Sequence, residues 1–147
     1  MDINSLSMKV LVNSPIDDVW KILVNWKSQG EWMLSTKVWL DSEIESGIGV
    51  KISALTGVGK FGILDTMEVT KWQPPYLCEV IHTGRIIKGD GTFALTSISA
   101  SRTEFYWQES IKAPKLLFLL IKPFIWLGVR ISLFRFTKFC EKSCETR

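Results

Sequence analysis

The chain has 147 residues, of which 46 % are hydrophobic, and a formal net charge of +3 at pH 7. This length fits one domain spanning residues 1–147, because a chain of this size buries roughly 68 to 70 % of its unfolded surface and needs no second domain to form a core. The charge is uneven, since eight basic residues against two acidic ones give the stretch from Lys112 to Arg147 a net +6 and leave −3 for residues 1–111.

The N-terminus lacks the basic-then-apolar pattern of a secretory signal, which favours a cytoplasmic protein. Cys140 and Cys144 lie one helical turn apart, no second Cys or His pair accompanies them, and His82 is the single histidine. We therefore expect Cys78, Cys140 and Cys144 to be structural, with no metal site and no cofactor.

Residues 8–13 alternate in polarity and predict a strand. A helix is expected to follow, with Ser14 as its cap, Pro15 in its first turn and Asp17 near its free N–H groups. A second short helix is expected over residues 26–33.

From Thr36 to Ile111 the hydrophobic pattern has period two and is interrupted by short turns, as in an antiparallel meander. Gly57 to Gly62 spells G-x-G-x-x-G, but a strand pattern follows it, so a hairpin is favoured over a phosphate-binding loop. The expected strands are 36–41, 49–55, 61–72, 76–83, 92–98 and 102–111.

The last 30 residues or so have helical composition, and Pro123 and Gly128 are expected to kink or divide the helix. The apolar run 116–129 falls short of the ~20 residues that cross a bilayer, so a buried or interfacial helix is expected. Two apolar stripes appear on the helical wheel. The first, expected to pack on the sheet, holds Ile125, Val129, Leu133, Phe136 and Cys140, and the second holds Phe124, Leu127, Ile131 and Phe134.

In this order of elements the chain resembles the START-like helix-grip superfamily of ligand-binding proteins, which includes polyketide cyclases/dehydrases and lipid-transport domains. The resemblance covers nearly the whole chain and implies an α+β fold in which a curved antiparallel sheet of about seven strands surrounds a long C-terminal helix. It implies a fold more firmly than an activity, and no invariant catalytic set maps onto this sequence. Its motifs are the helix start at 14–20, Asn25-Trp26 and Glu31-Trp32-Met33, the hairpin Gly47-Ile48-Gly49, the double-proline turn within 69–77, the strand 103–107 and the helix end 139–141.

Strand phase predicts which side chains face the helix, since Glu104 and Gln108 should lie on the opposite face from their neighbours. These inward residues are expected to form the core and, in part, to bind a ligand. They are Trp32, Phe61, Ile63, Met67, Val80, Phe93, Leu95, Phe105, Trp107 and Ile125.

Three ionisable residues, Asp65, His82 and Glu109, share the predicted lining. Such a trio could transfer protons in an aldol-type cyclisation or a dehydration without a metal. The alternative is structural: His82 hydrogen-bonds at the rim of the sheet, and Asp65 or Glu109 turns to solvent.

Three functions follow from these patterns. The first is a non-catalytic or weakly catalytic binder that holds a small hydrophobic ligand such as a lipid, isoprenoid or polyketide between sheet and helix. The second is a polyketide cyclase/dehydratase-type enzyme. The third is a peripheral module in which Arg130, Arg135 and Lys138, beside the second stripe, meet an anionic membrane or a protein partner. Nucleic acid is disfavoured because large aliphatic residues interleave with these cations, and the sequence leaves the oligomeric state open.

Overall fold

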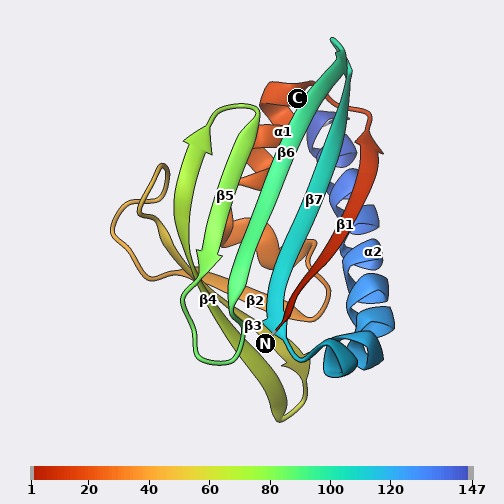
Figure 1. Cartoon of the computed structure of the whole chain (residues 1–147). Coiled ribbons are helices and arrows are strands. Elements are labelled where there is room, and N and C mark those ends of the chain that lie inside the picture. The colour runs from red at the N-terminus through yellow and green to blue at the C-terminus, as the bar shows by residue number, and fades with distance from the viewer. Residues whose placement is uncertain (1, 146–147) are drawn as a thin grey trace.

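Seven strands form one antiparallel sheet in the computed structural model, which describes residues 2–145, so Arg147 of the basic tail lies outside the described residues. The sheet confirms the expected meander, with strand order β1-β7-β6-β5-β4-β3-β2 (Figure 1). The strands are β1 (Asp2–Val12), β2 (Thr36–Leu40), β3 (Lys51–Val58), β4 (Phe61–Gln73), β5 (Leu77–His82), β6 (Gly89–Ser99) and β7 (Arg102–Ala113).

The first and last strands lie side by side. All eleven residues of β1 pair with β7, from Asp2 opposite Ala113 to Val12 opposite Thr103. This strand begins six residues earlier than the alternating pattern predicts, because Asn4, Ser5 and Ser7 hide the alternation while their backbone still completes the ladder.

Two short helices follow β1, as expected: α1 (Ile16–Leu23) and the 3₁₀ helix η1 (Trp26–Glu31). The expectation that Ser14 caps α1 is wrong, because the cap position is Pro15 and no side chain hydrogen-bonds there. The Ser14 side chain is instead buried. The backbone carbonyl oxygen of Ser14 accepts a hydrogen bond of 2.8 Å from the Thr103 hydroxyl of β7. This bond ties the start of α1 to the sheet.

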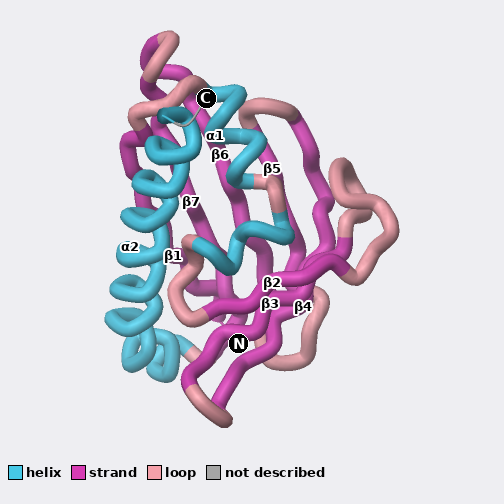
Figure 2. Tube along the Cα trace, turned by 180° about the vertical axis from the view of Figure 1, so that it is seen from behind, coloured by secondary structure: helices cyan, strands magenta, loops and turns pink. Residues whose placement is uncertain are grey.

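The C-terminal helix α2 (Lys115–Glu145) is continuous through Pro123 and Gly128, so neither residue divides it. Figure 2 shows α1 and η1 lying across the sheet and α2 running along its β1 side. The arrangement confirms the helix-grip architecture implied by the resemblance.

The two apolar stripes of α2 differ in burial. The first packs as expected, since Leu133, Phe136 and Cys140 are buried and Ile125 and Val129 are half-buried against the core. The second does not pack on the short N-terminal helices: Phe124 is 78 % exposed, and Leu127, Ile131 and Phe134 are exposed as well. By length and composition alone, α2 is also the one described helix that could cross a membrane.

An aromatic chain fills the space between α2 and the sheet. The ring centroids of Phe93 and Phe105 are 5.7 Å apart, those of Phe105 and Phe136 are 5.2 Å apart, and those of Phe136 and Trp32 are 4.7 Å apart. Such edge-to-face and tilted contacts add to the free energy of apolar burial. The space around these four rings is therefore filled by the protein's own side chains.

Candidate functional site

Asp65, His82 and Glu109 meet on the inner face of the sheet. The register places His82 opposite Met67, Glu109 opposite Gly91, and Asp65 opposite Ala54, so three different strands point these side chains to one face. His82 Nδ1 lies 2.8 Å from Asp65 Oδ1, and His82 Nε2 lies 2.7 Å from Glu109 Oε2. Both ring nitrogens of the imidazole are thus engaged by carboxylates.

A glycine makes room for this contact. A Cβ atom at Gly91 would lie 2.8 Å from Glu109 Oε1, closer than side-chain atoms normally approach. With hydrogen at that position, the Glu109 carboxylate can lie over the β6 backbone and reach His82 on β5. The sequence analysis did not identify Gly91 as part of the site. Gly91 lies on β6, between the strands that carry His82 and Glu109, and a glycine at this position could have indicated a close contact across it.

The environment fixes the charge of the imidazole. Burial by itself lowers the pKa of His82, but the hydrogen bonds to Asp65 and Glu109 and the charges of both carboxylates outweigh it and raise that pKa to about 10. The His82 side chain is 2 % exposed, so little water competes with these bonds. At neutral pH the ring is an imidazolium whose two N–H groups each donate a hydrogen bond to a neighbouring carboxylate.

Burial also raises the pKa of Glu109, and the nearby charges of Asp65 and Asp90 add to this, while the hydrogen bond and charge of His82 oppose it. The two carboxylates are less enclosed than the imidazole, because the side chains of Asp65 and Glu109 are 16 % and 17 % exposed. The cluster therefore presents carboxylate oxygens, which accept hydrogen bonds and attract cations, and keeps its positive charge inside.

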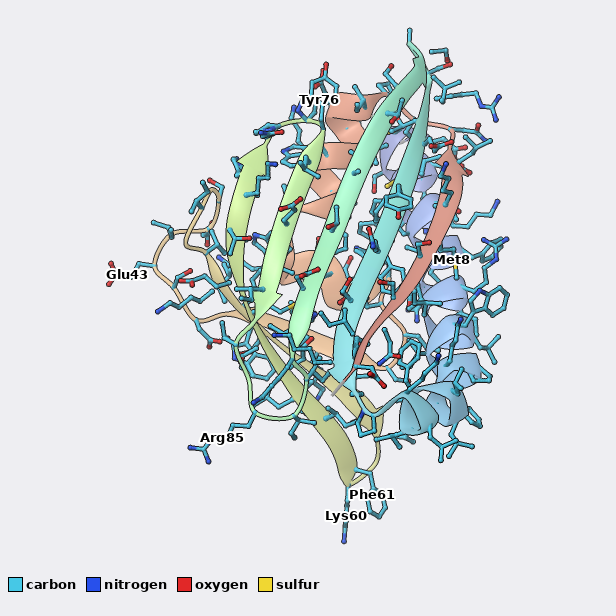
Figure 3. All side chains as sticks on the ribbon, in the orientation of Figure 1. Met8, Glu43, Lys60, Phe61, Tyr76 and Arg85 are labelled. Carbon is cyan, nitrogen blue, oxygen red and sulfur yellow. The ribbon has the colours of Figure 1, made fainter. Side chains whose placement is uncertain are left out.

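The other predicted lining residues divide into three groups by exposure. Trp32, Val80, Leu95, Phe105 and Trp107 are buried, and Met67, Phe93 and Ile125 are half-buried. Phe61 does not line the interior: it is 86 % exposed beside Lys60 at the end of the β3–β4 hairpin, where Figure 3 shows both pointing away from the body. Ile63, two residues along β4, is 50 % exposed. The phase of a strand predicts which face of the sheet a residue lies on, but not whether the helices cover the sheet at that point. Phe61 was therefore predicted to line the interior although the end of the hairpin is exposed.

Two buried indole N–H groups have no hydrogen-bond partner among the described residues, those of Trp26 and Trp32. A buried donor without an acceptor costs about 1 to 3 kcal/mol, so such a group favours binding of a water or ligand oxygen. Trp32 was predicted as an apolar contact surface, and its unpaired donor is an additional property that composition does not reveal.

Two hollows lie outside the cluster. A groove of about 620 Å³ runs between β2, the β3–β4 hairpin and Arg135 of α2, and a smaller one of about 370 Å³ separates Arg130 and Phe134 from β1. Neither is lined by Asp65, His82 or Glu109. Within residues 2–145 no group of three or more His, Cys, Asp or Glu side chains is arranged to hold a metal ion.

The three predicted membrane-facing cations have different surroundings. Arg135 Nη2 donates a hydrogen bond of 2.9 Å to the carbonyl oxygen of Glu31, so this side chain joins α2 to η1. Lys138 lies 3.9 Å from Glu141 and 5.6 Å from the centre of the Phe134 ring. Arg130 is exposed.

No protein-family model matches the sequence, and no curated protein does. Solved structures match in fold. The aromatase/cyclase Zhui from Streptomyces sp. R1128 is similar with a TM-score of 0.80 and 14 % identity, over 96 % of this chain and 95 % of that chain. A conserved protein from Geobacillus kaustophilus has a TM-score of 0.76 and 18 % identity, over 95 % of this chain and 97 % of that one.

A third similar structure is norcoclaurine synthase from Thalictrum flavum in complex with dopamine and hydroxybenzaldehyde, with a TM-score of 0.74 and 11 % identity, over 96 % of this chain and 88 % of that chain. At these identities the likeness establishes the START-like helix-grip fold alone. Activity has to be argued from the residues of this chain.

Proposed function

We propose that this protein binds a small, mainly apolar molecule on the inner face of its sheet and holds a polar group of that molecule at Asp65 and Glu109. The observation that carries the proposal is the hydrogen-bonded cluster of one imidazolium and two carboxylates. Burying charged groups costs free energy that pairing only offsets, and such clusters of perturbed ionisable groups are concentrated at functional sites. The fold agrees, since the similar norcoclaurine synthase was solved with two small aromatic molecules.

The charge of the cluster selects the polar group. The positive charge of His82 is enclosed, and the exposed atoms of the cluster belong to the two carboxyl groups. An ammonium or hydroxyl group is attracted there, whereas a carboxylate is repelled. The apolar part, of lipid, isoprenoid or polyketide type, would lie on Met67, Ile63 and Ile111 and gain roughly 25 cal/mol for each Å² removed from water.

Paired fluorescent probes with the same alkyl chain, one ending in an amine and the other in a carboxylate, test this proposal. We expect the amine probe to bind at least about tenfold more tightly, and the preference to disappear in the double variant Asp65→Asn, Glu109→Gln. The matched control is Glu79→Gln, Glu104→Gln, which removes two carboxylates outside the cluster and should keep the preference. Equal binding of both probes to the wild-type protein would contradict the proposal.

Acid–base catalysis is a second candidate function at the same site, favoured by the raised pKa of Glu109. A carboxyl group that keeps its proton to higher pH, next to an imidazole that is protonated at neutral pH, can protonate a leaving hydroxyl group while a second carboxylate removes a C–H proton. In a dehydration the C–H and C–O bonds break, a C=C bond forms, and water leaves with the transferred proton. Asp65 would act as the base and Glu109 as the acid.

An aromatic β-hydroxyketone provides a direct test of dehydration, because its enone product absorbs in the near ultraviolet. We expect turnover above the uncatalysed rate, and a loss of about 100-fold or more in Glu109→Gln. A rate unchanged by this substitution would remove the enzymatic candidate and leave the binding proposal intact.

A further inference from the structure

Exposed apolar side chains gather at one end of the molecule, here called the basal end. It consists of the β3–β4 turn, the β5–β6 loop (residues 83–88), the start of β1 and the first half of α2, and it lies at the bottom of Figure 1. Phe61, Lys60 and Arg85 mark this end in Figure 3, while Tyr76 marks the opposite one. Three segments far apart in the sequence place large exposed apolar residues there: Ile3 (69 %) of β1, Val58 (77 %) and Phe61 (86 %) of the β3–β4 hairpin, and Ile86 (70 %) of the β5–β6 loop.

The first half of α2 adds the largest apolar surface. The helix contains an 18-residue window with a mean hydropathy of 1.9, of which 11 % is buried. Leu116, Leu120 and Phe124 are 74 %, 66 % and 78 % exposed. An apolar surface of this extent on a water-soluble protein marks an interaction site.

This helix cannot cross a bilayer without leaving the fold. Phe118, in its first turn, is 4 % exposed and belongs to the core, and Leu133 and Phe136 further along are buried as well. Anchored at both positions, α2 keeps one side against the protein and turns the other outward. That geometry suits a helix lying in the plane of a membrane surface, with the protein body in place of the usual polar face.

Charge identifies the partner surface. Between Lys112 and Cys140 the chain has no acidic residue, and the cations Lys115, Lys122 and Arg130 of α2 are exposed. Lys60, Arg85, Lys88 and Lys112 surround the other basal segments. The acids near them are Asp2, Asp90 and the Asp65 and Glu109 side chains of the inner-face cluster, which His82 partly neutralises. Apolar side chains interspersed with cations are complementary to a bilayer that contains anionic lipids.

We propose that the basal end docks on anionic membranes, with α2 lying in the headgroup region and the β3–β4 turn and the 83–88 loop inserted beside it. The inner-face cluster lies close to this surface, since His82 is the last residue of β5 and Gly89 the first of β6. A docked protein would therefore hold its candidate binding site next to the lipid, although the docking proposal does not depend on that site.

Vesicle flotation tests the proposal, with vesicles of phosphatidylcholine alone and of equal parts phosphatidylcholine and phosphatidylglycerol. We expect the wild-type protein to float with the anionic vesicles, to float poorly with the neutral ones, and to be released as salt rises. Phe124→Glu and Lys122→Glu should each reduce the bound fraction about tenfold. The matched controls, Tyr76→Glu (58 % exposed) and Lys71→Glu, make the same changes away from the basal end and should bind like the wild type.

Three results would overturn the proposal. The first is a wild-type protein that does not float with anionic vesicles, and the second is an equal loss of binding in Tyr76→Glu and Phe124→Glu. The third is a stable dimer that Phe124→Glu converts to a monomer while vesicle binding is absent throughout, which would assign this surface to a second copy of the chain. Circular dichroism of each variant confirms that the fold is retained.

Discussion

His82 shows how the surroundings of a residue determine its chemistry. A free histidine is half-protonated near pH 6.5, whereas the two carboxylates raise the pKa of His82 to about 10. The imidazolium is therefore a fixed donor in the neutral range rather than a pH switch. The groups available to a ligand are the carboxylates on either side of it.

This pKa predicts a pH-dependent stability. Above pH 6.5 an unfolded His82 loses its proton while the folded one keeps it, so unfolding releases a proton and rising pH favours the unfolded state. We expect the free energy of unfolding to be highest below pH 6.5 and to fall towards pH 10, by up to about 1.4 kcal/mol per pH unit for this one proton. The raised pKa of Glu109 acts in the same direction, starting near pH 4.5.

Urea unfolding of the wild-type protein and of His82→Gln between pH 6.5 and 9 measures this effect. The measurement stops at pH 9 because burial raises the pKa of Cys78 from 9.0 to about 12. Above pH 9 this thiol would also lower the free energy of unfolding as the pH rises. The variant should lack the His82 contribution. Parallel pH profiles for the two proteins would show that His82 is not held as an imidazolium.

At this scale the sequence predicts which residues share a face but not how they meet. Period-two phase places Asp65, His82 and Glu109 on the inner side, as the register has them. Their contact depends on the position of Gly91 and on the pairing of three strands, and neither follows from the phase of a single strand. A function for the trio remains a prediction.

The helix α2 shows how one element can have two environments. Its fold-facing stripe was predicted correctly because apolar spacing of three and four residues identifies the side that packs. The partner of the second stripe was left open, since composition cannot tell a helix face that meets another helix from one that meets a protein partner or a lipid surface. Composition also left open whether Pro123 kinks or divides the helix. It does not divide it, because a proline inside a helix is tolerated where other contacts hold the turns on either side.

A pair of phenylalanines two positions apart measures this asymmetry. Phe136 is fully buried between Trp32 and Phe105, so Phe136→Ala should lower the free energy of unfolding by about 3 to 5 kcal/mol. Phe134 is 57 % exposed, and Phe134→Ala should change the free energy of unfolding by less than about 1 kcal/mol. Chemical denaturation of both variants is the measurement, and equal losses would mean that the outer stripe is covered in solution.

At the scale of the whole molecule, the pairing of β1 with β7 places the first and the last strand of the sequence side by side. β1 also supplies Leu6, Val10 and Val12 to the core and lies beside α2. Removing β1 would expose the edge of β7 and the apolar face under α2 together. The stability of the sheet therefore depends on its first strand more than the alternation of residues 8–13 suggests.

Deletion of residues 2–12 should abolish the cooperative thermal transition monitored by circular dichroism. A matched deletion within the exposed β2–β3 connection, residues 43–48, removes chain of low burial and should preserve the transition with a lower midpoint. A sharp transition in the protein without β1 would show that the remaining six strands and α2 are sufficient to fold.

The β1–β7 pairing also constrains biosynthesis. The first strand leaves the ribosome about a hundred residues before its partner, whose last paired residue is Ala113. Contacts between segments so distant in sequence form slowly, and until they form the nascent chain has unpaired strand edges. The apolar helix α2 follows β7 in the sequence, so it becomes available only after the last strand of the sheet. The sheet therefore cannot be completed until β7 has been synthesised, and the need for chaperones should persist until then.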